Sequence, residues 1–226
     1  MKKPFTLIGL TGLANAGKDT VADLLVAHAG FVKMAFADGL YAEVAEAFGV
    51  DVSHLHARET KEHPLSALAL RRCVSAGFVG RMLLLHPEQQ QVPFMDAPRS
   101  PRQILQWWGT EYRRAETPHY WTARASVRIN FQMRARLSTR FVLTDCRFQN
   151  EVHMVRQQFA GQIWQIKRAG VAAPTHGHIS ESDGDAYGPD CILANDHSIK
   201  HLQQLVLAEY WAHDAGLHGV KVEILA

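Results

Sequence analysis

The chain has 226 residues, 47% of them hydrophobic and 20% charged, with a formal net charge of +2 at pH 7. This size and composition predict one α/β domain with a full core, and the small net charge gives no general affinity for nucleic acid. No apolar run reaches the roughly 20 residues of a membrane helix, and the three cysteines lack the spacing of a disulfide framework or a zinc site. We therefore expect a cytoplasmic protein without a membrane or nucleic-acid partner.

The first predicted elements are an apolar strand over residues 5–8, a glycine-containing loop and a helix that begins near Lys18. Backbone N–H groups that turn inward around phosphate oxygens need residues without obstructing side chains, so Gly12 and Gly17 fit a phosphate-binding P-loop. The lysine would reach the β- and γ-phosphates of ATP, and the N-terminus of the helix favours the same anion. The predicted nucleotide-binding residues are Gly12, Asn15, Ala16, Gly17, Lys18, Asp19 and Thr20.

The residues after the lysine depart from the commonest P-loop pattern. A serine or threonine usually follows the lysine directly and binds Mg²⁺, whereas here Asp19 stands in that place and the hydroxyl comes one residue later, at Thr20. This Gly-Lys-x-Thr ending is closer to that of small-metabolite and nucleotide kinases than to that of GTPases and motor ATPases. The loop therefore predicts phosphoryl transfer to a small acceptor rather than a molecular switch.

The middle of the chain is predicted to be mostly helical after a second strand over residues 31–36. Asp38 is expected to cap the helix that follows this strand. Residues 50–98 lose the strand pattern and contain several prolines, so they are predicted to form a helical or lid insertion. A short helix is expected over residues 101–109, with Gly109 at its end, and a longer one over residues 119–137.

The last third returns to short apolar runs, which predict strands over residues 140–145, 163–166 and 192–193. An amphipathic helix through residues 199–206 closes the domain. Strands that alternate with helices predict an α/β fold. Because the chain starts with the glycine loop, we expect this fold to be of the P-loop nucleoside and nucleotide kinase type. Its mostly parallel, five-stranded sheet would have helices on both faces, and ligands would bind at the carboxyl ends of the strands.

An acidic residue at the end of a predicted strand forms the second candidate constellation. Asp145 would face Mg²⁺ or its waters, and Arg147 could point across the same cleft toward an acceptor phosphate. Two alternatives stay open, because Asp145 could instead be the N-cap of the next helix, and Glu151 could cap or stabilise that helix. The predicted Mg²⁺ site comprises Asp19, Thr20 and Asp145.

Arginines are concentrated over residues 99–148, which contain ten arginines, no lysine and three acidic residues. The planar guanidinium binds phosphate oxygens in pairs, so this segment fits an enzyme that binds an acceptor phosphate. Arg102, Arg124 and Arg147 are the candidates for the acceptor phosphate or for the charge of the transition state, and Lys18, Arg102, Asp145 and Arg147 form the predicted catalytic set.

Two further groups in this segment have alternative interpretations. Arg113 and Arg114 could close over the donor nucleotide and exclude water. Trp107, Trp108 and Trp121 could stack on a base, but core packing is the more common role of aromatic residues at helical spacing.

These motifs, in this order, resemble the deoxynucleoside monophosphate kinases of tailed phages and related bacterial sequences. The resemblance rests on residues 12–23, 102–110, 120–121, 145–151, 178–181 and 195–196, and no motif is matched over 50–98. It implies transfer of the γ-phosphate of ATP, with Mg²⁺, to the 5′-phosphate of a deoxynucleoside monophosphate, and it places His178, Ser180 and Glu181 near the nucleotide. The predicted substrate-binding residues are Arg102, Trp108, Gly109, Thr110, Arg124, Arg147, Glu151, His178 and Glu181.

Other functions stay open at this point. The same loop and arginines would serve another P-loop metabolite kinase, such as a dephospho-coenzyme A kinase or a phosphomevalonate kinase. A non-catalytic nucleotide-binding regulator is a more distant alternative, although the chain lacks the Asn-Lys-x-Asp box of GTPases. The sequence leaves open a homodimer and does not determine which base the acceptor carries.

Overall fold

The computed structural model describes residues 5–56, 61–87, 92–171 and 188–215. The chain divides into two compact units, the first formed by residues 1–36 and 125–226 and the second by residues 37–124. Each unit is described by itself, as the sheet unit and the helical unit. The insertion predicted over residues 50–98 falls within the helical unit, which extends beyond it in both directions.

The sheet unit contains five strands in the order β2-β3-β1-β4-β5, and every pair of neighbouring strands is parallel. This arrangement confirms the predicted α/β class and its five-stranded sheet. The elements of the unit in chain order are β1 Thr6–Thr11, α1 Lys18–Ala29, β2 Val32–Met34, the larger part of α7 Tyr120–Arg134, β3 Arg140–Leu143, α8 Gln149–His153 with its π-helical continuation Met154–Gln158, β4 Gln162–Lys167, β5 Cys191–Ala194 and α9 Ile199–Asp214.

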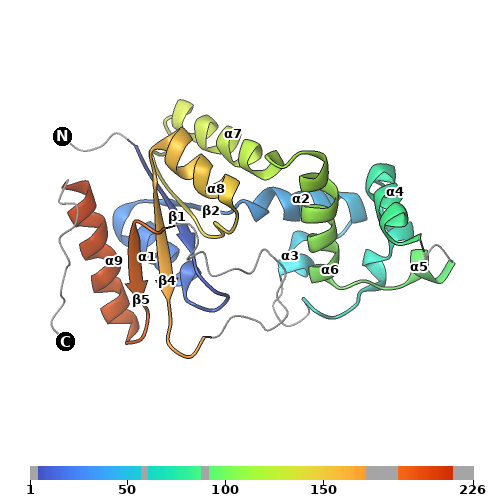
Figure 1. Cartoon of the computed structure of the whole chain (residues 1–226), viewed down its shortest axis with the longest axis horizontal. Helices are drawn as coiled ribbons and strands as arrows, with labels where there is room; N and C mark the ends of the chain where they lie inside the picture. Colours follow the sequence, from blue (N-terminus) through green and yellow to red (C-terminus); the bar gives the residue numbers. More distant parts are fainter. Residues whose placement is uncertain (1–4, 57–60, 88–91, 172–187, 216–226) are drawn as a thin grey trace. The chain divides into compact units, whose positions relative to one another are not determined.

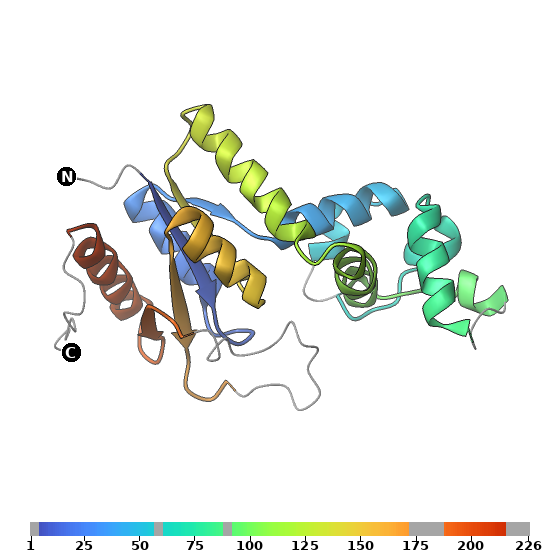
Figure 2. The same ribbon diagram turned by 45° about the horizontal axis from the view of Figure 1, so that its top comes forward.

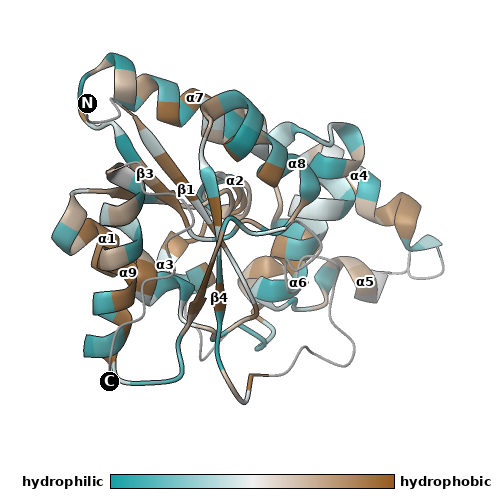
Figure 3. Cartoon of the chain, turned by 60° about the vertical axis from the view of Figure 1, so that its left-hand side comes forward, coloured by the Kyte–Doolittle hydropathy of each residue, from teal (hydrophilic) through white to brown (hydrophobic). Residues whose placement is uncertain are grey.

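Helices cover both faces of this sheet, as predicted, with α1 and α9 on one face and α8 on the other (Figures 1 and 2). On the first face, Leu25 of α1 and Val206 of α9 belong to the same buried cluster as Ile8, Trp164 and Leu193 of the strands. All six residues of β1 are buried. A strand covered on both faces can be apolar at successive rather than alternate positions, as at Leu7 and Ile8 of β1, and Figure 3 shows hydrophobic colouring over part of β1 and of β4.

The helical unit consists of short helices around an aromatic centre. Phe78 packs against Trp108 and Tyr112, with ring centroids 4.7 and 5.7 Å apart, and against Phe48 at 6.2 Å. The elements are α2 Ala37–Phe48, α3 Val52–His56, the single 3₁₀ turns Ser66–Leu68 and Leu70–Arg72, α4 Ala76–Leu85, α5 Val92–Asp96, α6 Pro101–Gln106, the π-helical segment Trp107–Arg114 and the first turn of α7.

Two of the expected helix ends in this unit are wrong. The helix expected over residues 101–109 does not end at Gly109, because α6 continues as the π-helical segment to Arg114. Gly109 is buried inside this segment, where an added Cβ would lie 3.2 Å from Leu40 Cδ2, so the glycine allows close packing rather than a turn. Asp38 is not a cap, because α2 begins at Ala37; it lies in the first turn, where a carboxylate favours the helix dipole.

Within the described parts of the chain, no helix combines the length and the apolar character needed to cross a membrane.

Candidate functional site

The glycine loop, residues 12–17, connects the carboxyl end of β1 to the N-terminus of α1. Three of its residues have positive φ angles, which are 129° at Gly12, 65° at Asn15 and 106° at Gly17. The N–H of Ala16 closes a tight turn by donating to the carbonyl of Leu13 at 3.2 Å. Helix α1 then begins at Lys18 and runs for 12 residues, so its N-terminal N–H groups lie beside the loop.

Lys18 lies against the loop that precedes it. Its ammonium donates to the carbonyl oxygens of Gly12 and Leu13, both at 2.7 Å. The side chain therefore turns back over the loop instead of extending into solvent. A positive charge is thus held beside the N-terminus of a helix, an arrangement that attracts anions.

The ends of β4 and β5 fix the position of the glycine loop. A Cβ on Gly12 would lie 2.3 Å from the carbonyl oxygen of Ile166 in β4. Asn195, directly after β5, donates from Nδ2 to the carbonyl of Ala16 at 2.9 Å, and a Cβ on Gly17 would lie 2.3 Å from that Nδ2. Gly12 is therefore required by a close backbone contact as well as by its φ angle, whereas at Gly17 the φ angle is the stronger reason.

Asn195 received no role in the sequence analysis, although its segment contributed to the family resemblance. Its backbone N–H donates to the carbonyl of Lys167 at 2.7 Å, which connects the end of β5 to the end of β4. Apart from that resemblance, its sequence signal was its position directly after a short core strand.

Asp145 lies at the carboxyl edge of the sheet, two residues beyond β3. Its Oδ1 accepts from the N–H of Phe36 at 2.7 Å, and the next residue, Cys146, donates from its backbone to Leu10 of β1 at 3.0 Å. These bonds place Asp145 at the edge from which the glycine loop also emerges. The alternative role as an N-cap is wrong, because the N-cap of α8 is Phe148.

Glu151 has the capping role that was the second alternative for it. Its Oε2 accepts from the backbone N–H groups of Arg147 at 2.7 Å and Phe148 at 3.0 Å, and the residue is 1% exposed. This buried carboxylate satisfies the backbone N–H groups of the two residues directly before α8, as in a capping box. The structure thus favours capping over substrate contact and shows how the backbone at Arg147 is held.

Asp19 pairs with Lys33 of β2, whose ammonium lies 3.0 Å from Asp19 Oδ1 and 2.9 Å from Asp23 Oδ1. Burial lowers the pKa of Lys33, but hydrogen bonds and charges from Asp23 and Asp19 outweigh it and raise the pKa above its ordinary value. Lys33 therefore stays charged. The Asp19 side chain is 60% exposed, so it also remains accessible to solvent.

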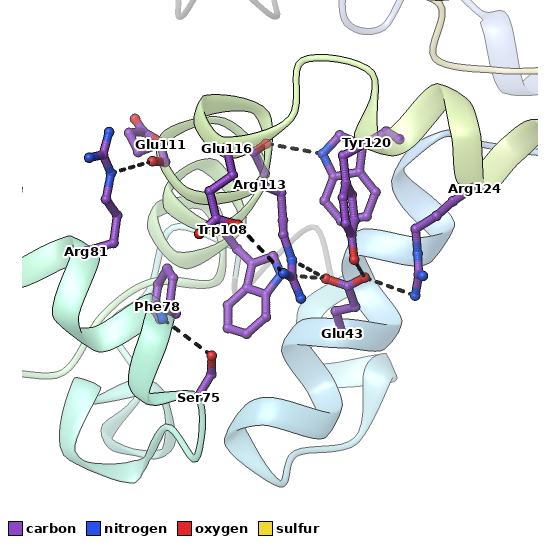
Figure 4. A network of polar contacts seen from close by, with 12 residues as sticks. Glu43, Ser75, Phe78, Arg81, Trp108, Glu111, Arg113, Glu116, Tyr120 and Arg124 are labelled. Atoms are coloured by element: carbon purple, nitrogen blue, oxygen red, sulfur yellow. Dashed lines mark hydrogen bonds and ion pairs between the residues drawn. The ribbon is translucent and has the colours of Figure 1, made fainter.

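Glu43 of α2 is the centre of a polar network in the helical unit (Figure 4). Its Oε2 accepts from Trp108 Nε1 and Arg113 Nε, both at 2.9 Å. Its Oε1 accepts from the Tyr120 hydroxyl at 2.6 Å and lies 2.9 Å from a terminal nitrogen of Arg124. No local pattern in the sequence singles out Glu43, because its partners lie 65 to 81 residues away along the chain.

The network keeps Glu43 ionised. Burial raises the pKa of its carboxyl, but hydrogen bonds from Tyr120, Trp108 and Arg113, together with the charge of Arg113, outweigh burial and lower the pKa below its ordinary value. Burial lowers the pKa of Arg113, but the hydrogen bond and the charge of Glu43 outweigh it and raise this pKa. Burial, followed by the hydrogen bond and the charge of Glu43, raises the pKa of the Tyr120 hydroxyl.

Several predicted residues in this unit have packing or pairing roles. Trp108 is 2% exposed and Trp121 3%, which agrees with core packing and leaves the Trp108 ring no open face for a base. Trp121 Nε1 donates to the carbonyl of Gly109 at 3.1 Å. Arg113, expected to close over a donor, is held by Glu43, and Arg102 pairs through its Nε with Glu62.

The remaining predicted residues divide into two groups. Thr20 in the first turn of α1 and Thr110 in the π-helical segment are both partly exposed. His178, Ser180 and Glu181 lie outside the described residues.

No protein-family model matches this chain, and no curated protein is significantly similar to it in sequence.

Proposed function

We propose that the protein transfers the γ-phosphate of ATP to the 5′-phosphate of a deoxynucleoside monophosphate, giving the diphosphate and ADP. The observation that carries the proposal is the glycine loop, whose lysine is bonded back over the loop at the N-terminus of α1. Together with the family resemblance of the motifs, this loop favours a polyphosphate ligand.

The residues around the loop fit ATP and Mg²⁺. Lys18 would neutralise charge on the β- and γ-phosphates, while Thr20 and the N–H groups of the loop would hold the α- and β-phosphates. The described residues contain no group of three or more His, Cys, Asp or Glu side chains that could hold a metal. Mg²⁺ here would take most of its ligands from phosphate and water, as it does in many kinase sites, with Asp19 and Asp145 accepting from those waters.

The reaction requires the protein to position the two reactants and to neutralise their charge, and it does not require a strong base. A bond forms between an oxygen of the acceptor phosphate and the γ-phosphorus, and the bond from the γ-phosphorus to ADP breaks. Both reactants are anions, so cationic side chains such as Lys18 and Arg147 of the sheet unit would lower their mutual repulsion. Exclusion of water would suppress ATP hydrolysis.

The direct test is ADP release from Mg·ATP with each deoxynucleoside monophosphate in turn. Ribonucleotides, dephospho-coenzyme A and buffer alone are the comparison reactions. We expect strong stimulation by one or a few deoxynucleotides, with the diphosphate as product. Stimulation by dephospho-coenzyme A alone would assign a different metabolite kinase, and nucleotide binding without any acceptor-stimulated turnover would assign a regulator.

Lys18→Ala tests whether the glycine loop is needed for this activity. We expect turnover to fall by a factor of at least about 100, because the variant removes the charge that offsets the developing negative charge. Lys200→Ala is the matched control, because Lys200 is an exposed lysine in the first turn of α9 of the same unit. Near-normal turnover in folded Lys18→Ala would rule out the role of the loop.

A further inference from the structure

Glu43 binds two arginines that differ in their surroundings. The Arg113 side chain is 24% exposed and lies over three aromatic rings, those of Tyr112, Tyr120 and Trp108, at 4.7, 4.8 and 5.6 Å from their centroids. The Arg124 side chain is 51% exposed and lies over the Tyr120 ring alone, at 5.4 Å. Arg113 is thus packed into the unit, whereas Arg124 faces solvent.

Most donors of Arg124 have no acceptor within the described part of the chain. A guanidinium has five N–H groups, and the one polar contact of Arg124 among the described residues is the 2.9 Å contact of its terminal nitrogen with Glu43. This contact and the stacking on Tyr120 fix the side chain while leaving donors directed away from Glu43 (Figure 4). A guanidinium that is held in place and still has unused donors is suited to a phosphate group.

The charges of the network agree with an anionic ligand. Glu43 contributes one negative charge against the two positive charges of Arg113 and Arg124. The carboxylate of Glu116, which is 56% exposed, lies 4.0 Å from a terminal nitrogen of Arg113. Among Glu43, Arg113 and Arg124 one positive charge is left over, and Arg124 is the arginine that is exposed to present it.

We propose that Glu43 is a positioning residue that holds Arg124 for the phosphate of the acceptor deoxynucleotide. The choice of a deoxynucleotide as the ligand rests on the proposed function. Glu43 does not touch the ligand itself; it fixes the guanidinium through one oxygen and uses the other to hold Trp108 and Arg113. The Glu43 carboxylate thus binds the packed residues Trp108 and Arg113 and also orients the exposed Arg124.

The test measures binding of deoxynucleoside monophosphates and of inorganic phosphate by titration calorimetry, with the full chain and without ATP. We expect Arg124→Ala to raise the Kd for the monophosphate at least 10-fold while leaving the melting temperature nearly unchanged, because the side chain is exposed. Glu43→Gln keeps the size of the residue but loses the charge, and we expect it to raise the same Kd at least 5-fold. Glu43→Asp, which restores the charge, should recover part of the affinity.

Arg71→Ala is the matched control for the loss of an arginine. Arg71 is an exposed residue of the helical unit that pairs with Asp96 and takes no part in the network. We expect its Kd to stay within twofold of the wild-type value. Normal monophosphate affinity in Arg124→Ala, or in folded Glu43→Gln, would overturn the proposal, as would the absence of binding to the wild-type chain.

Kinetics separate this proposal from the proposed function. Arg124→Ala and Glu43→Gln should each raise the KM for the acceptor and leave the KM for ATP unchanged. A purely structural role for Glu43 would not produce this difference between the two substrates. Monophosphate binding that depends on Arg124, without acceptor-stimulated turnover, would refute the kinase activity and support the Arg124 site. Acceptor-stimulated turnover with an unchanged KM in both variants would support the kinase activity and refute the site.

Discussion

Substitution of Gly12 by alanine should destabilise the sheet unit more than its single added carbon suggests. Gly12 has a φ of 129°, which L-residues rarely adopt, and the new Cβ would lie 2.3 Å from the carbonyl oxygen of Ile166. The carbonyl belongs to β4, which pairs with β1 on one side and β5 on the other, so it cannot rotate away as a flexible side chain would.

The magnitude follows from two separate costs. A non-glycine residue at such a φ costs about 1–3 kcal/mol. Real Cβ atoms essentially never approach closer than 3.0 Å, so the contact must open by about 0.7 Å, and overpacking of this kind costs about 1–3 kcal/mol. The two costs together amount to roughly 2–6 kcal/mol, a large part of the stability of a typical domain.

Gly30→Ala provides the matched control within the same unit. Gly30 follows α1 with a φ of 69°, and a Cβ there would meet nothing within 4 Å. This variant incurs the conformational cost alone, about 1 kcal/mol. Urea denaturation followed by circular dichroism would give the free energy of unfolding of both variants. If Gly12→Ala lost no more stability than Gly30→Ala, the close contact with Ile166 would not constrain the loop.

Two further predictions concern Glu43 and Asn195. The folded-state pKa of Glu43 lies below its ordinary value of 4.5, so its ionised form stabilises the fold fully above about pH 4.5, and this stabilisation is lost as the pH falls through the lower folded value. The difference in melting temperature between the wild type and Glu43→Gln should therefore be constant from about pH 5.5 to 7 and shrink below pH 4.5; a difference independent of pH would contradict this assignment. Asn195→Ala removes the hydrogen bond to Ala16 and should raise the KM for ATP about 3- to 10-fold with little change for the acceptor, whereas an unchanged KM for ATP would show that the loop holds its shape without Asn195.

The sequence predicted the elements whose signals are local. The strand before Gly12, the loop and the start of the helix at Lys18 follow from apolar runs and glycine spacing, and parallel pairing follows from alternating strands and helices. The end expected at Gly109 failed because its reason is a contact with Leu40, 69 residues away along the chain. A glycine that ends a helix and a glycine that admits a neighbour look the same in a sequence.

The polar network could not be predicted for a related reason. Glu43 lies on an amphipathic helix, where a glutamate is ordinarily a solvated residue, and nothing nearby in the sequence distinguishes it. Its role depends on partners brought together by the packing of α2, the π-helical segment and α7. Arginine-rich composition indicated that some of the arginines matter, but it could not separate the packed Arg113 from the exposed Arg124.

The winding of the π-helical segment, Trp107–Arg114, determines which of its side chains lie on the same face. The N–H of Ala115 donates to the carbonyl of Thr110, five residues back, so the segment is wound more loosely than an α-helix. Residues five apart face the same side of a π-helix, whereas at about 100° per residue in an α-helix they would lie about 140° apart. This winding lets Trp108 and Arg113, five residues apart, both bind Glu43, so substitutions that convert the stretch to an α-helix of the same length should break the network.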